Sequence, residues 1–238
     1  MNNKEIIEEL KEFVLPERFL TFQQVLSQRT RYISLLIENV YQSHNASAIV
    51  RTAEALGIQD IYVYERKNNF NPNEEISMGA HKWLNIHRFS ENSISTTELI
   101  TNLKNKGYRI IATSLHDKST DIESLDLLKG KIMFLFGTEK EGLTEEIKSQ
   151  ADEFIKIPMV GFTESFNVSV SVGIILYSMI TKLQKSNINY KLSEEEIEKL
   201  MMDWLVKSIP MGDKVLERII KRGCLKIETV FFLFLISF

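Results

Sequence analysis

The amino-acid sequence predicts an α/β protein whose mainly parallel sheet is flanked by helices. Apolar runs of strand length alternate with segments of helical apolar spacing over roughly 150 residues, an order typical of α/β folds. The first unit, a strand, a helix and a second strand within 32–64, requires a crossover connection and therefore parallel strands. With 44% apolar and 26% charged residues among 238, the chain can bury a core of ordinary size.

Two short helices are predicted ahead of this unit. The apolar residues of 4–28 recur at helical spacing, and Pro16 divides the segment because proline interrupts a helix interior. Arg29 and Arg31 follow at the start of the next element, where two arginines give only weak support for a phosphate contact.

The first unit of the sheet consists of two strands and the helix between them. The run YISLLIENV at 32–40 is apolar enough for a buried strand, and IQDIYVY at 58–64 supplies the second. Asn45 or Ser47 is predicted to cap the helix, because either side chain can accept from an otherwise unpaired backbone N–H. Gly57 is predicted to end it.

The middle of the chain continues the alternation. The polar stretch 65–91, rich in asparagine, is predicted to be a loop. A helix is predicted over 96–106, ending at Gly107, and a strand over 108–114. The strongly apolar run at 132–136 predicts another strand.

A short helix and a further strand extend the pattern. Thr144 is predicted to cap a helix whose first turn carries Glu145 and Glu146, as the helix dipole prefers. EFIKIPM at 153–159 predicts the strand. Parallel sheets bind ligands at the carboxyl ends of their strands, so the loops there are expected to meet at one crevice. These loops follow Thr113, Gly137 and Met159.

The stretch 157–176, IPMVGFTESFNVSVSVGIIL, carries two conflicting periodicities. Its middle alternates polar and apolar residues as a half-buried strand does, yet its apolar residues also recur at helical spacing. We expect a strand ending near Met159, a loop through Phe166 and a helix that begins at Asn167. The alternative is a continuous strand through Val172.

The C-terminal section, 192–223, is helical by pattern. Ser193 and Glu196 have the spacing of a capping box at its start. A basic cluster follows, formed by Lys214, Arg218, Lys221, Arg222 and Lys226. The last ten residues, TVFFLFLISF, fall far short of the ~20 apolar residues of a membrane-spanning helix. A buried strand or an incidental terminus is therefore favoured over a membrane anchor.

Three parts are expected along the chain: an N-terminal helical extension at 1–31, a central α/β domain at 32–186 and a C-terminal helical extension at 187–238. The N-terminus lacks the apolar core of a signal peptide, which predicts a cytoplasmic protein. Cys224 is the single cysteine, so no intrachain disulfide is expected. No metal site is expected either, because the histidines are scattered at His44, His81, His87 and His116.

Several common chemistries find no motif in the sequence. Neither G-x-G-x-x-G nor a P-loop occurs, and no G-x-S-x-G surrounds Ser165, which argues against a Rossmann dehydrogenase, a P-loop NTPase and a hydrolase. The net charge of −3 means that nucleic-acid binding would require a local basic patch. Composition and spacing alone therefore indicate a ligand-binding α/β domain.

Three segments read together are more specific. They are HNASAIVRTAEALGI at 44–58, LFGTEKEGLT at 135–144 and the stretch at 157–176. In this order they closely resemble the three signature motifs of the TrmH-type branch of the SPOUT RNA methyltransferases, and the AHKW at 80–83 also matches. The resemblance extends over 28–185. It is strongest to members that methylate the ribose 2′-hydroxyl of guanosine 18 in the tRNA D-loop.

The resemblance implies a fold that local rules would not propose. The family threads its C-terminal strand and helix through a loop as a deep trefoil knot, although knots are nearly absent from other folds. S-adenosyl-L-methionine is implied to bind in this knot, mainly through backbone groups. The implied cofactor-binding residues are Thr113, Gly137, Ile157 and Phe166. A homodimer whose partner chain completes the site, and a tRNA substrate, are also implied.

The resemblance further implies a set of catalytic residues, namely Arg51, Asn45, Glu139, Ser165 and Asn167. The motif-one arginine, here Arg51, is implied to act on the attacking 2′-hydroxyl. A guanidinium stays protonated to beyond pH ~12, so its role is open between an unusual general base and a fixed cation that stabilises the developing alkoxide. Asn45 is expected to position Arg51, and Glu139 to shape the cofactor loop. Ser165 and Asn167 are expected to order the site.

One departure from the family concerns RNA docking. Relatives often carry two arginines just past the third motif, and the matching positions here are Thr181 and Leu183. Lys182, Lys185 and the basic cluster are candidates to replace them, although lysine does not reproduce the bidentate grip of arginine on phosphate. Two alternatives stay open at this point: a ribosomal RNA ribose methyltransferase and a non-catalytic RNA-binding protein of the same fold.

Overall fold

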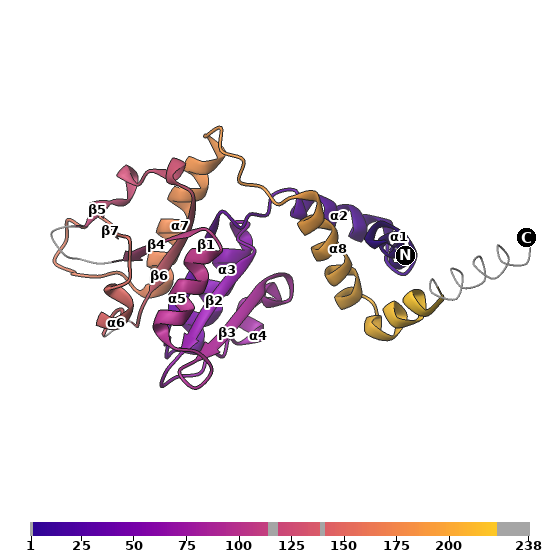
Figure 1. Cartoon of the computed structure of the whole chain (residues 1–238), viewed down its shortest axis with the longest axis horizontal. Helices are drawn as coiled ribbons and strands as arrows, with labels where there is room; N and C mark the ends of the chain where they lie inside the picture. Colours follow the sequence, from indigo (N-terminus) through magenta and orange to yellow (C-terminus); the bar gives the residue numbers. More distant parts are fainter. Residues whose placement is uncertain (1, 114–118, 139–140, 223–238) are drawn as a thin grey trace, which may run out of the picture. The chain divides into compact units, whose positions relative to one another are not determined.

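The computed structural model describes residues 2–113, 119–138 and 141–222 (Figure 1). These residues fall into two compact units. Thr30–Lys191 forms one unit, which holds the whole sheet, and the described residues before and after it form the other. The two ends of the described chain therefore belong to the same unit.

Seven parallel strands form one sheet in the order β3-β2-β1-β6-β4-β7-β5. They are β1 (Ile33–Glu38), β2 (Asp60–Glu65), β3 (Asn85–Ser90), β4 (Tyr108–Thr113), β5 (Thr120–Asp121), β6 (Lys131–Phe136) and β7 (Glu153–Lys156). β6 lies between β1 and β4, which both precede it in the chain, and β7 lies between β4 and β5. The predicted α/β class with a parallel sheet is confirmed.

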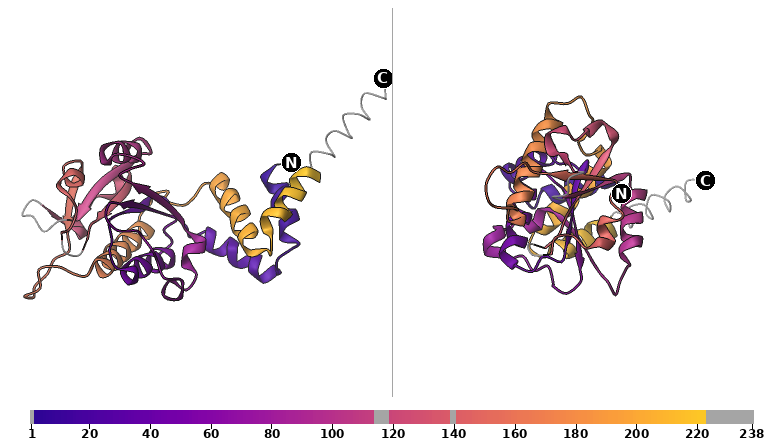
Figure 2. Two further views of the ribbon diagram at one scale, coloured as in Figure 1. Left: turned by 90° about the horizontal axis from the view of Figure 1, so that it is seen from below. Right: turned by 90° about the vertical axis from the view of Figure 1, so that its left-hand side faces the viewer.

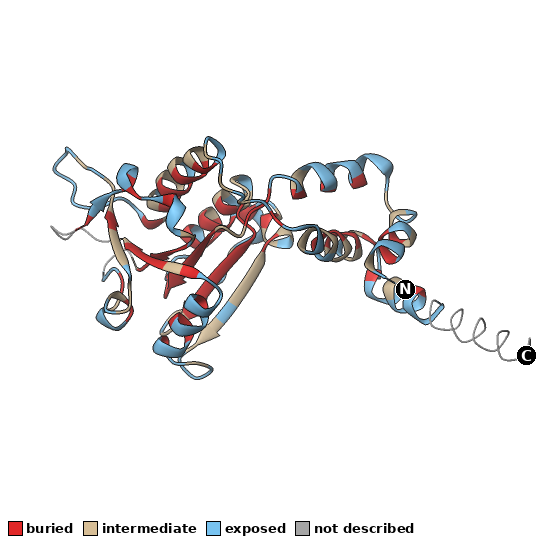
Figure 3. Ribbon diagram, turned by 45° about the horizontal axis from the view of Figure 1, so that its top comes forward, coloured by how far each residue is buried: buried red, intermediate tan, exposed pale blue. Residues whose placement is uncertain are grey.

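Helices cover both faces of this sheet (Figure 2). They are α3 (Ser43–Ala55), α4 (Glu74–Ser77), α5 (Thr96–Asn105), α6 (Glu145–Lys148) and α7 (Val168–Gln184). α3 and α7 pack side by side on one face, whereas α5 and α6 cover the other. Leu35 and Ile37 of β1 enter the first apolar layer and Leu36 enters the second. The inner strands are therefore buried on both faces, which explains their continuous apolar runs (Figure 3).

The predicted cap of α3 is wrong. The helix begins at Ser43, and Gln42 before it makes no capping hydrogen bond from its side chain. Asn45 lies inside the helix with its side chain buried, and Ser47 donates its hydroxyl to the carbonyl oxygen of Ser43 at 2.7 Å. Their side chains thus serve contacts other than capping. The predicted end is confirmed, because Gly57 has a left-handed φ of 79°.

The predicted loop at 65–91 is wrong in part, because it contains α4, a 3-10 turn at Ala80–Trp83 and the edge strand β3. An edge strand is only partly buried, so β3 lacks the apolar run of the inner strands. Its polar residues instead contact the buried Asp60 of β2. Asp60 accepts from Asn85 Nδ2 at 2.9 Å and lies 3.1 Å from His87 Nε2.

The stretch 157–176 enters a helix, as predicted. β7 ends at Lys156, earlier than the predicted end near Met159. Asn167 caps α7 by accepting from the N–H of Ser169 at 2.9 Å, and the helix begins at Val168. A continuous strand through Val172 is therefore excluded.

The other unit is helical. It contains α1 (Asn3–Lys11), α2 (Pro16–Leu26), α8 (Glu194–Ser208) and a further helical segment at 212–222. Pro16 separates the first two helices, and the capping box of Ser193 and Glu196 is confirmed. Trp204 is buried at the centre of this unit, with the guanidinium of Arg29 5.4 Å from its ring. Arg29 is therefore a core residue.

Lys226 and the apolar segment 229–238 lie outside the described residues. Among the helices that the structure describes, none combines the length and the apolar character needed to cross a membrane. The division of the chain at 31/32 and 186/187 stays a prediction.

Asp60 gives the sheet a stability that depends on pH. Burial alone would raise the pKa of Asp60, but the hydrogen bond from His87, the charge of Arg31 and the hydrogen bond from Asn85 together hold that pKa below its ordinary value. A carboxyl group with a lowered pKa stabilises the folded state above its unfolded pKa of about 4. This contribution is lost as the pH falls through the folded pKa.

Asp60→Asn should lower the free energy of unfolding by about 2–4 kcal/mol at pH 7, because Arg31, 2.7 Å away, loses a buried carboxylate partner. The difference from the unaltered protein should shrink as the pH falls from about 4 toward about 2. Urea unfolding at several pH values measures this difference. A difference that does not change over this range contradicts a charged Asp60 in the folded state.

Candidate functional site

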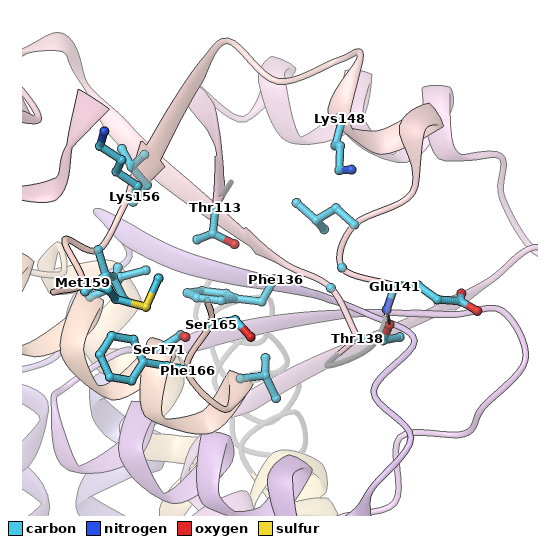
Figure 4. A pocket seen from close by; sticks show the side chains of 17 residues that line it. Thr113, Phe136, Thr138, Glu141, Lys148, Lys156, Met159, Ser165, Phe166 and Ser171 are labelled. Atoms are coloured by element: carbon cyan, nitrogen blue, oxygen red, sulfur yellow. Dashed lines mark hydrogen bonds between the residues drawn. The ribbon is translucent and has the colours of Figure 1, made fainter. Parts of the chain in front are cut away.

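A cavity of about 370 Å³ lies at the carboxyl ends of β4, β6 and β7 (Figure 4). Its walls come from the last residues of these strands, the loops after β6 and β7, and the first turns of α7. Phe136, Leu143, Ile155 and Ile175 supply apolar surface. Ligand pockets typically span roughly 300–1,000 Å³ and combine apolar walls with a few polar groups, so the cavity suits one small organic molecule.

All four predicted cofactor-binding residues line this cavity, namely Thr113, Gly137, Ile157 and Phe166. They come from three segments that the strand order brings together. Thr113 donates its hydroxyl to the carbonyl oxygen of Leu135 at 3.1 Å, which holds the end of β4 against β6. In Figure 4, Met159 and Phe166 lie on one side of the cavity, and Thr138 and Glu141 lie on the other.

The loop after β6 turns so tightly that position 137 requires glycine. The backbones of Thr138 and Gly142 exchange two hydrogen bonds, of 3.1 and 3.0 Å, which hold the two sides of the loop together. A Cβ atom at Gly137 would overlap the backbone of Gly142 and Leu143. The loop can therefore fold back on itself beside the cavity only because this residue has no side chain.

A buried carboxylate anchors the far end of the same loop. Glu38, the last residue of β1, accepts from the N–H of Thr144 at 2.9 Å and from its hydroxyl at 2.8 Å. Arg66 pairs with Glu38, Glu91 and Glu146. Burial alone would lower the pKa of Arg66, but the hydrogen bond to Glu146 and the carboxylate charges raise it overall. That hydrogen bond also lowers the pKa of Glu146, so the pair stays charged at neutral pH.

Two of the predicted catalytic residues meet where α3 and α7 begin. Asn167 donates from Nδ2 to Oδ1 of Asn45 at 3.2 Å, and Asn45 donates in turn to Gln42 Oε1 at 3.2 Å. The Oδ1 atom of Asn167 accepts from the backbone and the hydroxyl of Ser169. Ser165, just ahead of this junction, lies on the cavity wall. The first and third motifs are thus side by side.

Arg51 and Glu139 differ from the other predicted residues. Arg51 lies exposed on α3 and is not part of the cavity wall. Within the part of the chain that the structure describes, the side chain of Arg51 makes no ion pair or hydrogen bond. Glu139 lies outside the described residues. The structure therefore joins Asn45, Ser165 and Asn167 to the cavity region but leaves Arg51 facing solvent.

Three charged residues of the cavity wall were not predicted from the sequence: Glu141, Lys148 and Lys156. Lys148 pairs with Glu145 at 2.8 Å, and Lys156 lies 4.0 Å from Asp121. The sequence offered one signal for a charged residue in the cavity wall, namely that Lys156 directly precedes the third motif. These residues do not form a metal site, because the described chain holds no cluster of three or more His, Cys, Asp or Glu able to bind a metal ion.

Lys182 and Lys185, the candidates to replace the two arginines of relatives, differ in whether their side chains are available to bind RNA. Lys182 donates to the carbonyl oxygens of Glu123 and Leu125 at 3.0 and 2.6 Å, and so fastens α7 to the turn after β5. Leu183 is fully buried. Lys185 is exposed. Lys182 is therefore already engaged within the chain.

Gly137→Ala should destabilise the sheet unit by about 2 kcal/mol or more, because the new methyl group must displace backbone of the loop. It should also weaken the binding of S-adenosylmethionine, the cofactor that the motifs imply. Gly173→Ala is the matched control, since a Cβ there would lie 3.9 Å from a methyl group of Thr52, at ordinary contact distance. This control should gain up to about 1 kcal/mol from helix propensity.

Thermal unfolding and calorimetric titration of both variants measure these effects. If Gly137→Ala keeps the stability and the affinity of the unaltered protein, the tight turn at Gly137 does not shape the site.

Comparison with known proteins gives the chain its family context. The profile of the SpoU rRNA Methylase family matches residues 32–177, more than half of the chain. A Borreliella burgdorferi protein described as tRNA (guanosine(18)-2'-O)-methyltransferase is 40% identical over 195 residues, which cover 82% of this chain and 87% of that protein. The family match includes all three motifs, of which the second and third line the cavity.

Solved structures agree with this match. The Aquifex aeolicus TrmH/SpoU tRNA modifying enzyme has a TM-score of 0.72 at 33% identity, covering 82% of this chain and 98% of that one. An AdoMet-bound rRNA methyltransferase from Sinorhizobium meliloti shares the fold, with a TM-score of 0.57 and 23% identity over 67% of this chain and 59% of that one. The chain belongs to the SpoU methylase family.

Proposed function

We propose that this protein acts in the cytoplasm and transfers the methyl group of S-adenosylmethionine to the ribose 2′-hydroxyl of guanosine 18 in tRNA. The extent of the likeness to the B. burgdorferi tRNA (guanosine(18)-2'-O)-methyltransferase carries the proposal. Its 195 matched residues exceed the unit Thr30–Lys191, so the likeness reaches into the terminal helices. A relative that catalysed the same reaction on another substrate would need to resemble this chain only over the sheet unit.

The cavity fits S-adenosylmethionine as the methyl donor. Its size suits one such molecule, Phe136 and Ile155 offer apolar surface, and Gly137 contributes to the wall. The proposed contacts are the predicted Thr113, Gly137, Ile157 and Phe166. When bound, the cofactor supplies an electrophilic methyl group on a sulfonium. The AdoMet-bound S. meliloti structure of the same fold supports this assignment.

The proposed catalytic residues act mainly by orientation and charge. Transfer needs the 2′-oxygen in line with the methyl group, so ordering of the ribose contributes much of the rate. Ser165, Asn45 and Asn167 are proposed to provide this order at the rim of the cavity, and Glu139 to shape the cofactor loop. Arg51 lies exposed, and arginine in general serves as a fixed cation and not as a base, so a cation beside the reacting oxygen is the role that we favour.

Exposed apolar residues on α7 support a homodimer. One side of α7 is buried, but Val170 and Tyr177 are 47% and 66% exposed, and Phe166 just before the helix is 41% exposed. A second copy of the chain is proposed to cover this surface. In such a dimer, Arg51 of one copy is proposed to serve the cavity of the other copy, which accounts for its place outside the cavity wall.

The strand order supports the proposed trefoil knot. β6 and β7 each lie between two strands that precede them in the chain. A chain that returns to the middle of its own sheet can pass through an earlier loop. α7, which follows β7 directly, is the element proposed to complete the knot.

Docking of tRNA is proposed on the basic cluster of the terminal unit. Lys214, Arg218 and Lys221 share one side of the helical segment 212–222 and are exposed, without an ion pair to any described residue. Arg222 pairs with Glu9 instead. Clustered cations of this kind bind phosphate even on a chain of net negative charge.

A ribosomal RNA substrate has less support. The match to the S. meliloti rRNA methyltransferase covers 59% of that chain and 67% of this one, so substantial parts of both lie outside it. A non-catalytic RNA-binding role is opposed by the presence of all five predicted catalytic residues. The tRNA assignment therefore accounts for more of the chain.

The proposal predicts that an unmodified tRNA transcript gains a labelled methyl group on the ribose of guanosine 18. A transcript with 2′-deoxyguanosine at this position is the matched negative substrate, because it lacks the attacking oxygen. Nuclease digestion followed by mass spectrometry maps the label. A label on a base, or on a ribose outside the D-loop, contradicts the proposal.

Arg51→Ala should lower kcat/KM for this reaction by about 10²–10³-fold, the usual loss when a charge-stabilising group is removed. The Kd of S-adenosylmethionine should stay within about threefold, because Arg51 is proposed to act on the reacting oxygen and not on the cofactor. Arg88→Ala, at an exposed arginine of β3, is the control and should keep full activity. Undiminished transfer by Arg51→Ala would rule out the role assigned to it.

A further inference from the structure

We infer that Glu38 is a positioning residue whose carboxylate fixes the β6–α6 loop against the sheet and thereby sets the affinity for the methyl donor. The β6–α6 loop is defined here by its described residues, 137–138 and 141–144. The inference about affinity rests on the proposed function. The contact itself does not.

Strand β1 contacts both ends of this loop. At the start, parallel pairing places Phe136 opposite Ile37, so Gly137 leaves the sheet beside Glu38. At the end, Glu38 accepts both the N–H and the hydroxyl of Thr144, at 2.9 and 2.8 Å, across 106 residues of sequence. One strand end therefore holds the loop at its two junctions.

The burial of Glu38 and its charged and polar partners make its contact with Thr144 strong. Glu38 is 1% exposed, and a buried carboxylate is costly unless its charge and its lone pairs are satisfied. Arg66 supplies the charge, with its Nε 3.0 Å from Glu38, and Thr144 supplies two donors. The other carboxylates that Arg66 contacts, Glu91 and Glu146, are about half exposed, where ion pairs contribute little.

The loop can transmit this constraint to the cavity because it is closed internally. The backbones of Thr138 and Gly142 are hydrogen bonded to each other, and Thr138 Oγ1 accepts from the N–H of Glu141 at 3.0 Å. The described residues of the loop should therefore move together about its junctions. Thr138, Glu141, Gly142 and Leu143 all line the cavity, so loss of the anchor at Thr144 would shift this wall.

Four variants separate positioning from general stability. Glu38→Gln removes the charge and replaces one of the two acceptor oxygens with a donor, so the two present contacts with Thr144 can no longer each have their own acceptor oxygen. Its Kd for S-adenosylmethionine should rise about tenfold, while kcat at saturating cofactor stays within about threefold. Thr144→Ser keeps both donors and should stay within about twofold, whereas Thr144→Val should fall between these results. Glu91→Gln removes another partner of Arg66 without touching the loop, and should also stay within about twofold.

Amide hydrogen exchange, measured without cofactor, tests directly how firmly the loop is held. Peptides that cover the β6–α6 loop should exchange at least about threefold faster in Glu38→Gln, while peptides of β2 and β3 stay unchanged. If Glu38→Gln does not fold, Thr144→Val is measured against Thr144→Ser in its place. A Kd within about twofold of the unaltered protein, or faster exchange throughout the sheet unit, overturns the inference.

Failure of the proposed function can be distinguished from failure of the inference about Glu38. In that case the unaltered protein does not bind S-adenosylmethionine in the calorimeter. Hydrogen exchange then decides alone whether Glu38 positions the loop, because that measurement needs no ligand.

Discussion

The hydrogen bond between Asn45 and Asn167 joins two helices across 122 residues of sequence, and the walls of the site depend on it. Asn45 is 2% exposed, and the loss of a hydrogen-bond partner from a buried polar group costs about 1–3 kcal/mol. Asn167 also caps α7 through its other amide atom. One side chain therefore fixes both where α7 begins and where that start lies relative to α3. The loop from β7, which carries Ser165 and Phe166 into the cavity wall, must end at the same point.

The parallel sheet supplies the second constraint. All strands end at one edge, and the place of β6 between β1 and β4 brings the Gly137 turn next to Thr113. The cavity is thus built from strand ends, the loops after β6 and β7, and the start of α7. Gly137 lets the backbone fold tightly, and the carboxylate of Glu38 holds the far end of the turn. The second and third motifs of the family thus form a shaped wall around a small molecule, and the first motif contacts the third through Asn45.

Local rules predicted the parts of this protein that depend on near neighbours in sequence. The inner strands follow from burial on both faces, and the caps at Thr144 and Asn167 follow from contacts two or three residues long. β3 was missed because its polar residues serve a tertiary partner, Asp60. The cavity wall at the strand ends was predictable, but the contact of Glu38 with Thr144 was not, since no local pattern marks it. The exposed position of Arg51 likewise depends on its surroundings in three dimensions.

A double-variant cycle on kcat/KM for methyl transfer to tRNA tests most directly whether the Asn45–Asn167 contact holds the site together. Asn45→Ala removes one partner, and Asn167→Ser removes the other while keeping a good helix cap. The account predicts a coupling of at least about 1.4 kcal/mol, so that the double variant is at least about tenfold faster than the product of the two single losses would give. Losses that multiply across the two substitutions would contradict it, because the two side chains would then act independently.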